Sequence, residues 1–171
     1  MLKALYDYGL RRQLTLPPGF IEKTVKAYIS LSEDNDRVSI YLGDDEQLPC
    51  PDMGSLAQGR DKCNVLVEKR SIVIPDAPAD GAKPAKSEFF LETLRDASEE
   101  EPLLKTCVRA LETPEIAEAI RAKLDHMKIK PGDRVSFRVN GNSMVESENI
   151  RRWWREYRKR FAKGDASPTE L

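Results

Sequence analysis

Residues 25–42 read VKAYISLSEDNDRVSIYL and predict a β-hairpin. Apolar side chains alternate with polar ones in two runs: Val25, Ala27, Ile29 and Leu31, then Val38, Ile40 and Leu42. This alternation is typical of strands that bury one face. The polar residues at 32–36 supply the turn between the two runs.

The rest of the chain adds helices and one more hairpin to this unit. Before and after the hairpin, we expect a helix at 2–12, a turn at 17–19, irregular chain at 43–64, a strand at 71–74 and a Pro/Ala linker at 75–86. Three helices follow: one capped by Ser87, one at 103–111 and one that begins at Thr113. The chain then forms a strand at 135–139, a turn at Asn140-Gly141 and a helix after Ser147. This order predicts an α+β fold, in which a small antiparallel β-sheet packs against a cluster of helices. We expect one domain at 1–163, with sub-parts 1–74, 87–128 and 130–163, and a polar tail at 164–171.

The composition is that of a globular protein without a membrane segment. The chain has 171 residues, of which 33% are charged and 40% hydrophobic, and its net charge is −1. Its apolar runs are too short to span a membrane, and its first residues lack the apolar stretch of a signal peptide. We therefore expect a cytoplasmic protein. Cys50, Cys63 and Cys107 form no CxxC pair, so we expect buried or idle thiols.

Charge is unevenly distributed along the chain. Residues 33–52 and 92–118 are rich in acids, whereas the segment after 150 is basic. The predicted C-terminal helix would bury Ile150, Trp153, Trp154, Tyr157 and Phe161 on one side. The basic side chains that could contact nucleic acid or a partner subunit are Arg151, Arg152, Arg155 and Arg158, of which Arg151, Arg155 and Arg158 are expected to project outward. An ordinary solvated helix face is the alternative interpretation.

The segment from Gly54 to Arg70, GSLAQGRDKCNVLVEKR, has the composition of a nucleic-acid-binding loop. Glycines permit close approach of the backbone, cationic side chains neutralise phosphates, and amides can read base edges. The candidate contact residues are Gly54, Ser55, Gln58, Gly59, Arg60, Lys62, Asn64, Lys69 and Arg70. Residues 65–67 would serve as an apolar anchor. A solvated surface loop is again the alternative.

The sequence does not indicate an enzyme, a cofactor or a metal site. His126 is the single histidine, and no nucleophile, phosphate-loop or zinc motif is present. The adjacent acids Asp44, Asp45 and Glu46 could bind a cation, although a solvated turn explains them equally simply. The pair Trp153-Trp154 could stack on bases, but these positions are typical of a helix core.

Taken together, the ordered segments resemble one protein family, the large subunit of the type I-C CRISPR Cascade surveillance complex. The matching segments, in chain order, are MLKALYDYGLRR (1–12), LTLPPGF (14–20), KAYISLSEDNDRVSIYLGDD (26–45), GSLAQGRDKCNVLVEKRSIV (54–73), KSEFFLETLRDAS (86–98), GDRVSFRVNGNSMVES (132–147) and WWREY (153–157). The resemblance spans nearly all of the chain. Members of that family are much longer, so we expect an N-terminal domain. One departure follows Asn64, where many relatives carry an aromatic-rich run and this chain has Val65-Leu66-Val67.

The resemblance implies a non-catalytic DNA-recognition domain in a crRNA-guided antiviral complex. In such complexes base pairing reads the target, while protein reads a short adjacent motif, the PAM. The implied partners are double-stranded target DNA, the crRNA-containing Cascade subunits that hold the handle and the backbone, the helicase-nuclease, and inhibitor proteins from phage. Asn64 and Gln58 would contact base edges, and Arg60 and Lys62 would hold phosphates or wedge into the duplex.

Two alternatives stay open at this point. The domain could be a scaffold that binds the crRNA handle and partner subunits without reading bases. It could also be a small metal-dependent nuclease that uses Asp44, Asp45 and Glu46.

Overall fold

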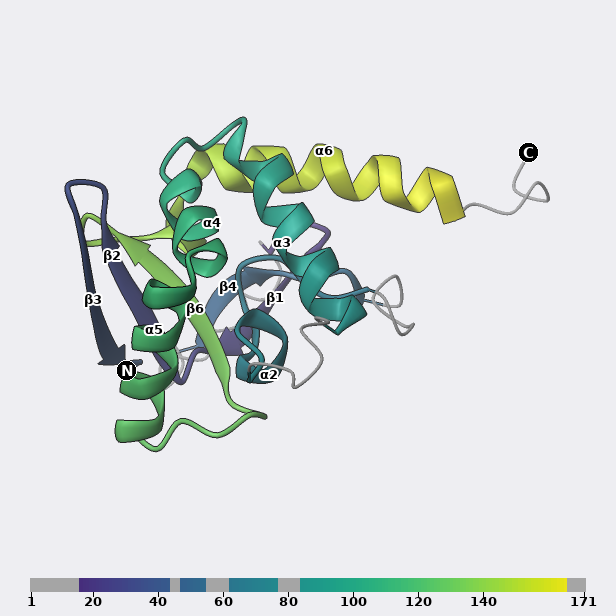
Figure 1. Ribbon diagram of the computed structural model, residues 1–171. Coiled ribbons are helices and arrows are strands. Elements are labelled where there is room, and N and C mark those ends of the chain that lie inside the picture. Colours follow the sequence, from purple (N-terminus) through teal and green to yellow (C-terminus); the bar gives the residue numbers. More distant parts are fainter. Residues whose placement is uncertain (1–15, 44–46, 55–61, 77–83, 166–171) are drawn as a thin grey trace, which may run out of the picture.

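The computed structural model describes residues 16–43, 47–54, 62–76 and 84–165, except for the side chains of Asn35 and of residues 161–165 (Figure 1). The elements are β1 (Phe20–Thr24), β2 (Ala27–Ser32), β3 (Asn35–Leu42), β4 (Gln47–Pro51), β5 (Glu68–Lys69), α2 (Arg70–Val73), α3 (Ala85–Ser98), α4 (Leu104–Glu112), α5 (Pro114–His126), β6 (Arg134–Val139), β7 (Asn142–Ser143), the 3₁₀ helix η2 (Met144–Glu146) and α6 (Glu148–Asp165). The α+β class is confirmed. The predicted helix at 2–12, most of the linker and the tail at 166–171 lie outside the described residues.

The larger sheet has five strands, in the order β3-β2-β6-β5, with β7 paired to β6. The predicted hairpin is confirmed, because β2 and β3 pair antiparallel with Ile29 opposite Ile40. However, β2 and β6 are parallel, so this sheet is mixed rather than purely antiparallel. The reason lies in the connection: the chain passes through the helices after β3 and returns beside β2 in the same direction, as a crossover requires.

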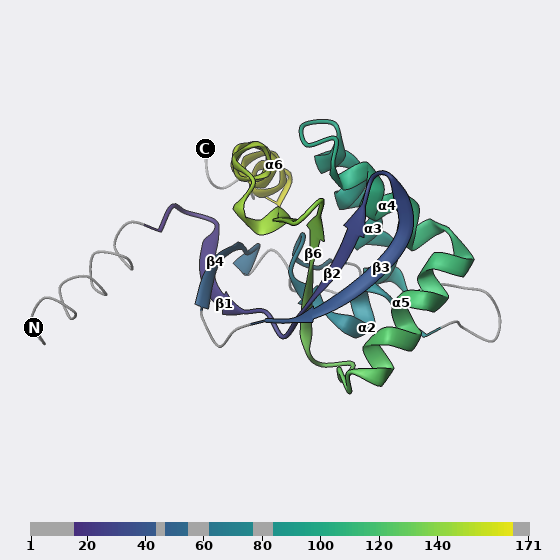
Figure 2. The same ribbon diagram turned by 90° about the vertical axis from the view of Figure 1, so that its left-hand side faces the viewer.

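One face of this sheet is apolar and is covered by helices. Ala27, Ile29, Val135, Phe137 and Val139 are all fully buried. Figure 2 shows α3, α4 and α5 together on one side of the sheet, with the β1–β4 pair beyond β6 on the other. Amphipathic helices bury their apolar faces on the apolar face of a sheet. One hydrophobic cluster results, with members from Phe20 to Trp154.

A second, two-stranded sheet formed by β1 and β4 was not predicted. Phe20 pairs with Pro51 and Thr24 with Gln47, so part of the segment expected to be irregular at 43–64 is a strand. Two prolines in β4 made this strand hard to predict, because within sheets proline is found mainly in edge strands. In addition, Lys23 is buried within β1, which breaks the apolar pattern.

The predicted strand at 71–74 is wrong, because Arg70–Val73 forms one helical turn. The Ile74 N–H donates to the Arg70 carbonyl at 2.9 Å. The N–H groups of Arg70 and Ser71 donate to the carbonyls of Asp133 and Pro131. Contacts with a distant segment therefore override the local preference of β-branched residues for strands.

The other helices follow the sequence closely, with two differences at their starts. Helix α3 begins at Ala85, and Ser87 lies buried inside it rather than at its cap. Pro114 opens α5 as expected, but the Thr113 hydroxyl donates to the Arg109 carbonyl and does not cap the helix. The turn at Asn140-Gly141 is confirmed, since both residues have positive φ angles, 52° and 83°.

Candidate nucleic-acid interface

Asp52 fixes the start of the predicted binding loop. One of its carboxylate oxygens lies 2.7 Å from Nζ of Lys23, whose side chain is 4% exposed. The other oxygen accepts the N–H of Gly54 at 2.7 Å. A buried cation that keeps its charge requires such a partner, so the pair ties the first residue of the loop to β1.

Asn64 closes the same loop from its other end. Its side-chain Oδ1 accepts the N–H of Met53 at 2.8 Å, and its own N–H donates to the Glu68 carboxylate at 2.9 Å. The two ends of the loop are therefore held together by a side-chain clasp. Asn64 was expected to contact a base edge, and the oxygen of its amide is engaged within the protein.

The predicted apolar anchor is confirmed, since Val65, Leu66 and Val67 are all fully buried. The Val67 N–H donates to the Val65 carbonyl at 2.7 Å, and Leu66 has a φ of 66°. This is a γ-turn of the rare, strained kind. Strain of this sort costs on the order of 1–3 kcal/mol and persists only where the surrounding structure enforces it. Burial of Leu66 thus holds the C-terminal end of the loop in place.

The structure separates the predicted contact residues into three groups. Gly54 and Lys69 are exposed, and Lys62 is half-buried. Ser55, Gln58, Gly59 and Arg60 lie outside the described residues. Arg70 is in the interior: its guanidinium donates to the Ile129 carbonyl and pairs with Asp125 at 2.6 Å, and its side chain is 7% exposed. We therefore leave Arg70 out of the interface.

Replacing Asn64 tests whether it is a clasp or a base reader. We expect Asn64→Ala to lower the free energy of unfolding by about 1 kcal/mol, because the Met53 N–H loses its partner. Asn64→Asp keeps an acceptor oxygen and should be less destabilised. Chemical denaturation followed by circular dichroism measures both. If Asn64→Ala unfolds like the wild type, the clasp is unimportant and the amide is free to read bases.

The basic helix α6 is anchored to the same region through Gly19. The Gly19 carbonyl accepts the indole N–H of Trp154 at 2.7 Å and the backbone N–H of Asp52 at 2.8 Å. Gly19 has a φ of 88°, and a Cβ there would lie 2.6 Å from Cδ of Arg158. Only glycine fits this close approach. One carbonyl therefore joins the helix to the start of the loop.

The outward face of α6 differs from the predicted one. Arg151 is half-buried and donates to the Val145 carbonyl, and Arg158 is half-buried against Gly19, so the expectation that these two project outward is wrong. Both lie at the edges of the side that buries Trp153 and Trp154. Arg152, Arg155 and Lys159 are exposed and follow one another at helical spacing. The side chain of Phe161 is outside the described residues.

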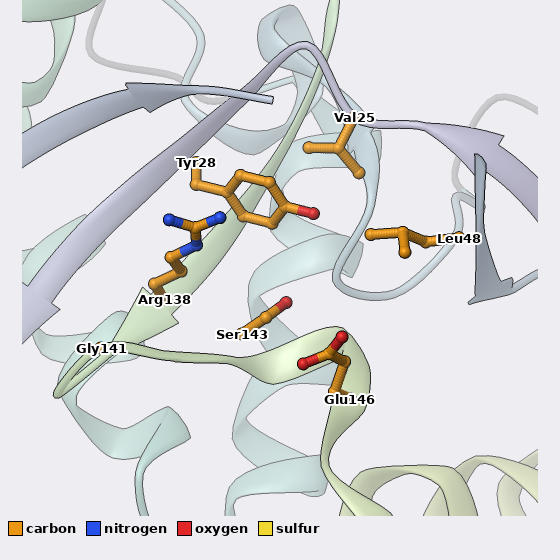
Figure 3. Close-up of a pocket in the computed structure, with 7 residues that line it drawn as sticks. All are labelled: Val25, Tyr28, Leu48, Arg138, Gly141, Ser143 and Glu146. Atoms are coloured by element: carbon orange, nitrogen blue, oxygen red, sulfur yellow. The ribbon is translucent and has the colours of Figure 1, made fainter. Parts of the chain in front are cut away.

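A polar pocket of about 370 Å³ lies between the larger sheet and β4 (Figure 3). The ring of Tyr28 points into it, and the Arg138 guanidinium lies 4.3 Å from the ring centre. Ser143 and Glu146 face the ring from the opposite side, and Val25 and Leu48 close the apolar end. Burial raises the pKa of Tyr28, and the charge of Arg138 partly offsets this rise. Tyr28 is thus a neutral hydroxyl at physiological pH.

Sequence reasoning missed this pocket because its lining comes from five separate elements and from two connecting residues, Val25 after β1 and Gly141 between β6 and β7. The available signal was the polar series between the apolar residues of each strand, Tyr28 in β2 and Arg138 in β6. Such residues are ordinarily assigned to solvent.

The three cysteines are free and buried, as predicted. Burial raises the pKa of Cys50 to about 11 and that of Cys63 to about 12, and it also raises the pKa of Cys107. Because the thiolate is the reactive form, these thiols are poor nucleophiles near neutral pH.

Within the described ranges, no three His, Cys, Asp or Glu side chains lie close enough together to hold a metal ion. Asp44, Asp45 and Glu46 are outside these ranges. Among the described helices, none provides the length of apolar residues that a membrane span requires. No family model matches the chain, and no curated protein is significantly similar to it.

Proposed function

We propose that this chain is a non-catalytic DNA-recognition domain of a crRNA-guided surveillance complex, which contacts the PAM duplex and helps to open the target. The observation that carries the proposal is the construction of the loop base. Asp52 and Asn64 hold the two ends of the loop, and the buried residues 65–67 fix it to the core. A loop presented from a rigid base suits recognition, because little order has to be gained on binding.

The exposed basic side of α6 adds to this interface. Gly19 joins the helix to Asp52, so the two segments keep a fixed relation to each other. Arg152, Arg155 and Lys159 would neutralise phosphates, while the loop contacts the groove. Phosphate contacts set position and base contacts set specificity.

The engaged amide of Asn64 favours a second candidate function, that of a scaffold that binds crRNA and partner subunits without reading bases. Duplex-binding measurements separate the two. The assembled complex is titrated with target duplexes whose flanking positions are randomised. Enrichment of particular flanking sequences supports recognition of a PAM. Equal binding of all flanks supports the scaffold.

The cationic loop residues should act on all duplexes alike. We expect Arg60→Ala and Lys62→Ala to weaken duplex binding and to reduce the slope of log affinity against log salt by about one unit for each lost contact. Lys105→Ala is the matched control, because Lys105 is an exposed lysine on α4. If the salt slope is unchanged in both loop variants, these side chains do not touch the phosphates.

A further inference from the structure

The larger sheet has a polar face opposite the helices. Strand register places Tyr28 beside Tyr41 on β3 and beside Ser136 on β6. Ser30 lies beside Arg138 in the same way, and residues in register point to the same side of a sheet. Lys69 lies opposite Arg134 at the far end of this face, and both are exposed. The face therefore carries aromatic rings, hydroxyls and cations.

Arg138 is the cation at the centre of this face. Its guanidinium lies 4.3 Å from the centre of the Tyr28 ring and 5.8 Å from that of Tyr41, and it forms no ion pair with any of the described residues. Ser143 interacts with Tyr28, and Ser136 is completely buried, so neither hydroxyl is free for a ligand. A guanidinium that stacks on aromatic rings without a carboxylate partner is suited to an aromatic or anionic ligand.

We propose that this face binds single-stranded nucleic acid, with one base entering the pocket beside Tyr28 and Arg138. The ring of Tyr41 is 50% exposed, which leaves it available for stacking on a neighbouring base. Unpaired bases are bound by stacking on aromatic rings and by hydrogen bonds to their edges, whereas a duplex hides both.

Glu146 determines which part of the nucleotide enters the pocket. Its carboxylate faces the cavity across from Arg138 (Figure 3). A carboxylate repels phosphate but accepts hydrogen bonds from an amino group such as N4 of cytosine. The base therefore points inward, while Arg134 and Lys69 lie along the path of the backbone. The volume of about 370 Å³ is within the range of small-molecule sites, about 300–1,000 Å³.

This site is tested with the full chain and short labelled oligonucleotides of one base each, in RNA and DNA form, by fluorescence anisotropy. We expect oligocytidine to bind more tightly than oligouridine, because uracil has no amino group for Glu146. Tyr41→Ala should weaken binding about tenfold through lost stacking. Leu42→Ala is the matched control: this neighbour is 56% exposed, but it points to the other face of the sheet. The RNA and DNA arms show which polymer the face prefers.

Glu146→Gln supplies the second measurement, since it should reduce the ratio of the affinities for oligocytidine and oligouridine. Tyr41→Ala and Glu146→Gln both replace exposed side chains, and melting curves verify that the two variants fold. The proposal is overturned if the wild type binds no single strand, or if Tyr41→Ala behaves as Leu42→Ala does. It is independent of the loop: the Arg60 and Lys62 variants should lose duplex affinity while these variants retain it.

Discussion

Trp154→Ala is expected to destabilise the protein strongly. The side chain is fully buried, and its indole N–H donates to Gly19. Truncating a buried tryptophan costs about 3–5 kcal/mol, a large part of a total stability of about 5–15 kcal/mol. Each kcal/mol lowers the Tm of a chain of this size by about 2–4 °C, so we expect a drop on the order of 10 °C. Circular dichroism melts measure it.

Two further variants show how much of this loss comes from apolar packing and how much from the hydrogen bond. Trp154→Phe keeps most of the apolar contact and removes only the N–H, so its cost should be near that of one hydrogen bond, about 1 kcal/mol. Arg155→Ala changes the exposed neighbour and should stay within about 0.5 kcal/mol of the wild type. Trp153 is 6% exposed and stacks 4.8 Å from Tyr157, so Trp153→Ala should also lower the Tm sharply. If Trp154→Ala and Arg155→Ala melted alike, α6 would not be anchored through its indole side.

Elements with a regular apolar pattern could be predicted from the sequence. The alternation in residues 25–42 gave the β2–β3 hairpin, and the apolar stripe from Leu104 to Leu111 gave α4. In both, local preference and burial agree, since each apolar side chain faces the core. The sequence is most informative where local preference and burial indicate the same element.

Elements fixed by distant contacts could not be predicted. β1 buries Lys23, which is possible only because Asp52 lies 2.7 Å away. The helical turn at Arg70–Val73 depends on carbonyls of residues 131 and 133. The parallel pairing of β2 with β6 depends on the path of the helices between them. None of these partners is visible in the local sequence.

In the candidate site, too, features set by local apolar character could be predicted, and features set by distant contacts could not. The burial of residues 65–67 followed from their apolar character. The roles of Asn64 and Arg70 did not, because a polar side chain in a basic segment can equally face a ligand or satisfy the backbone. Here Asn64 holds Met53, and Arg70 holds Ile129 and Asp125. A composition typical of nucleic-acid binding thus includes residues that build the loop rather than contact the ligand.

The exposed side of α6 provides the largest expected change in binding. We expect simultaneous replacement of Arg152, Arg155 and Lys159 by Glu to abolish most of the duplex affinity of the assembled complex. Each phosphate contact contributes about 0.9 to the salt slope, so the slope should fall by up to roughly 2.7. The effect on affinity should be larger than that of neutral substitutions, because the new carboxylates repel the phosphates.

Folding and net charge must be separated from this effect. The three residues are exposed, so melting curves should shift little. The matched control replaces Lys105, Lys123 and Lys130 by Glu, three exposed lysines on or after the helices α4 and α5. It changes the net charge by the same amount but leaves the α6 face intact. If both triple variants lost affinity equally, the overall charge would govern binding. If the α6 variant bound and assembled normally, its basic face would be a solvated surface, and the DNA contact would reduce to the loop that Asp52 and Asn64 hold in place.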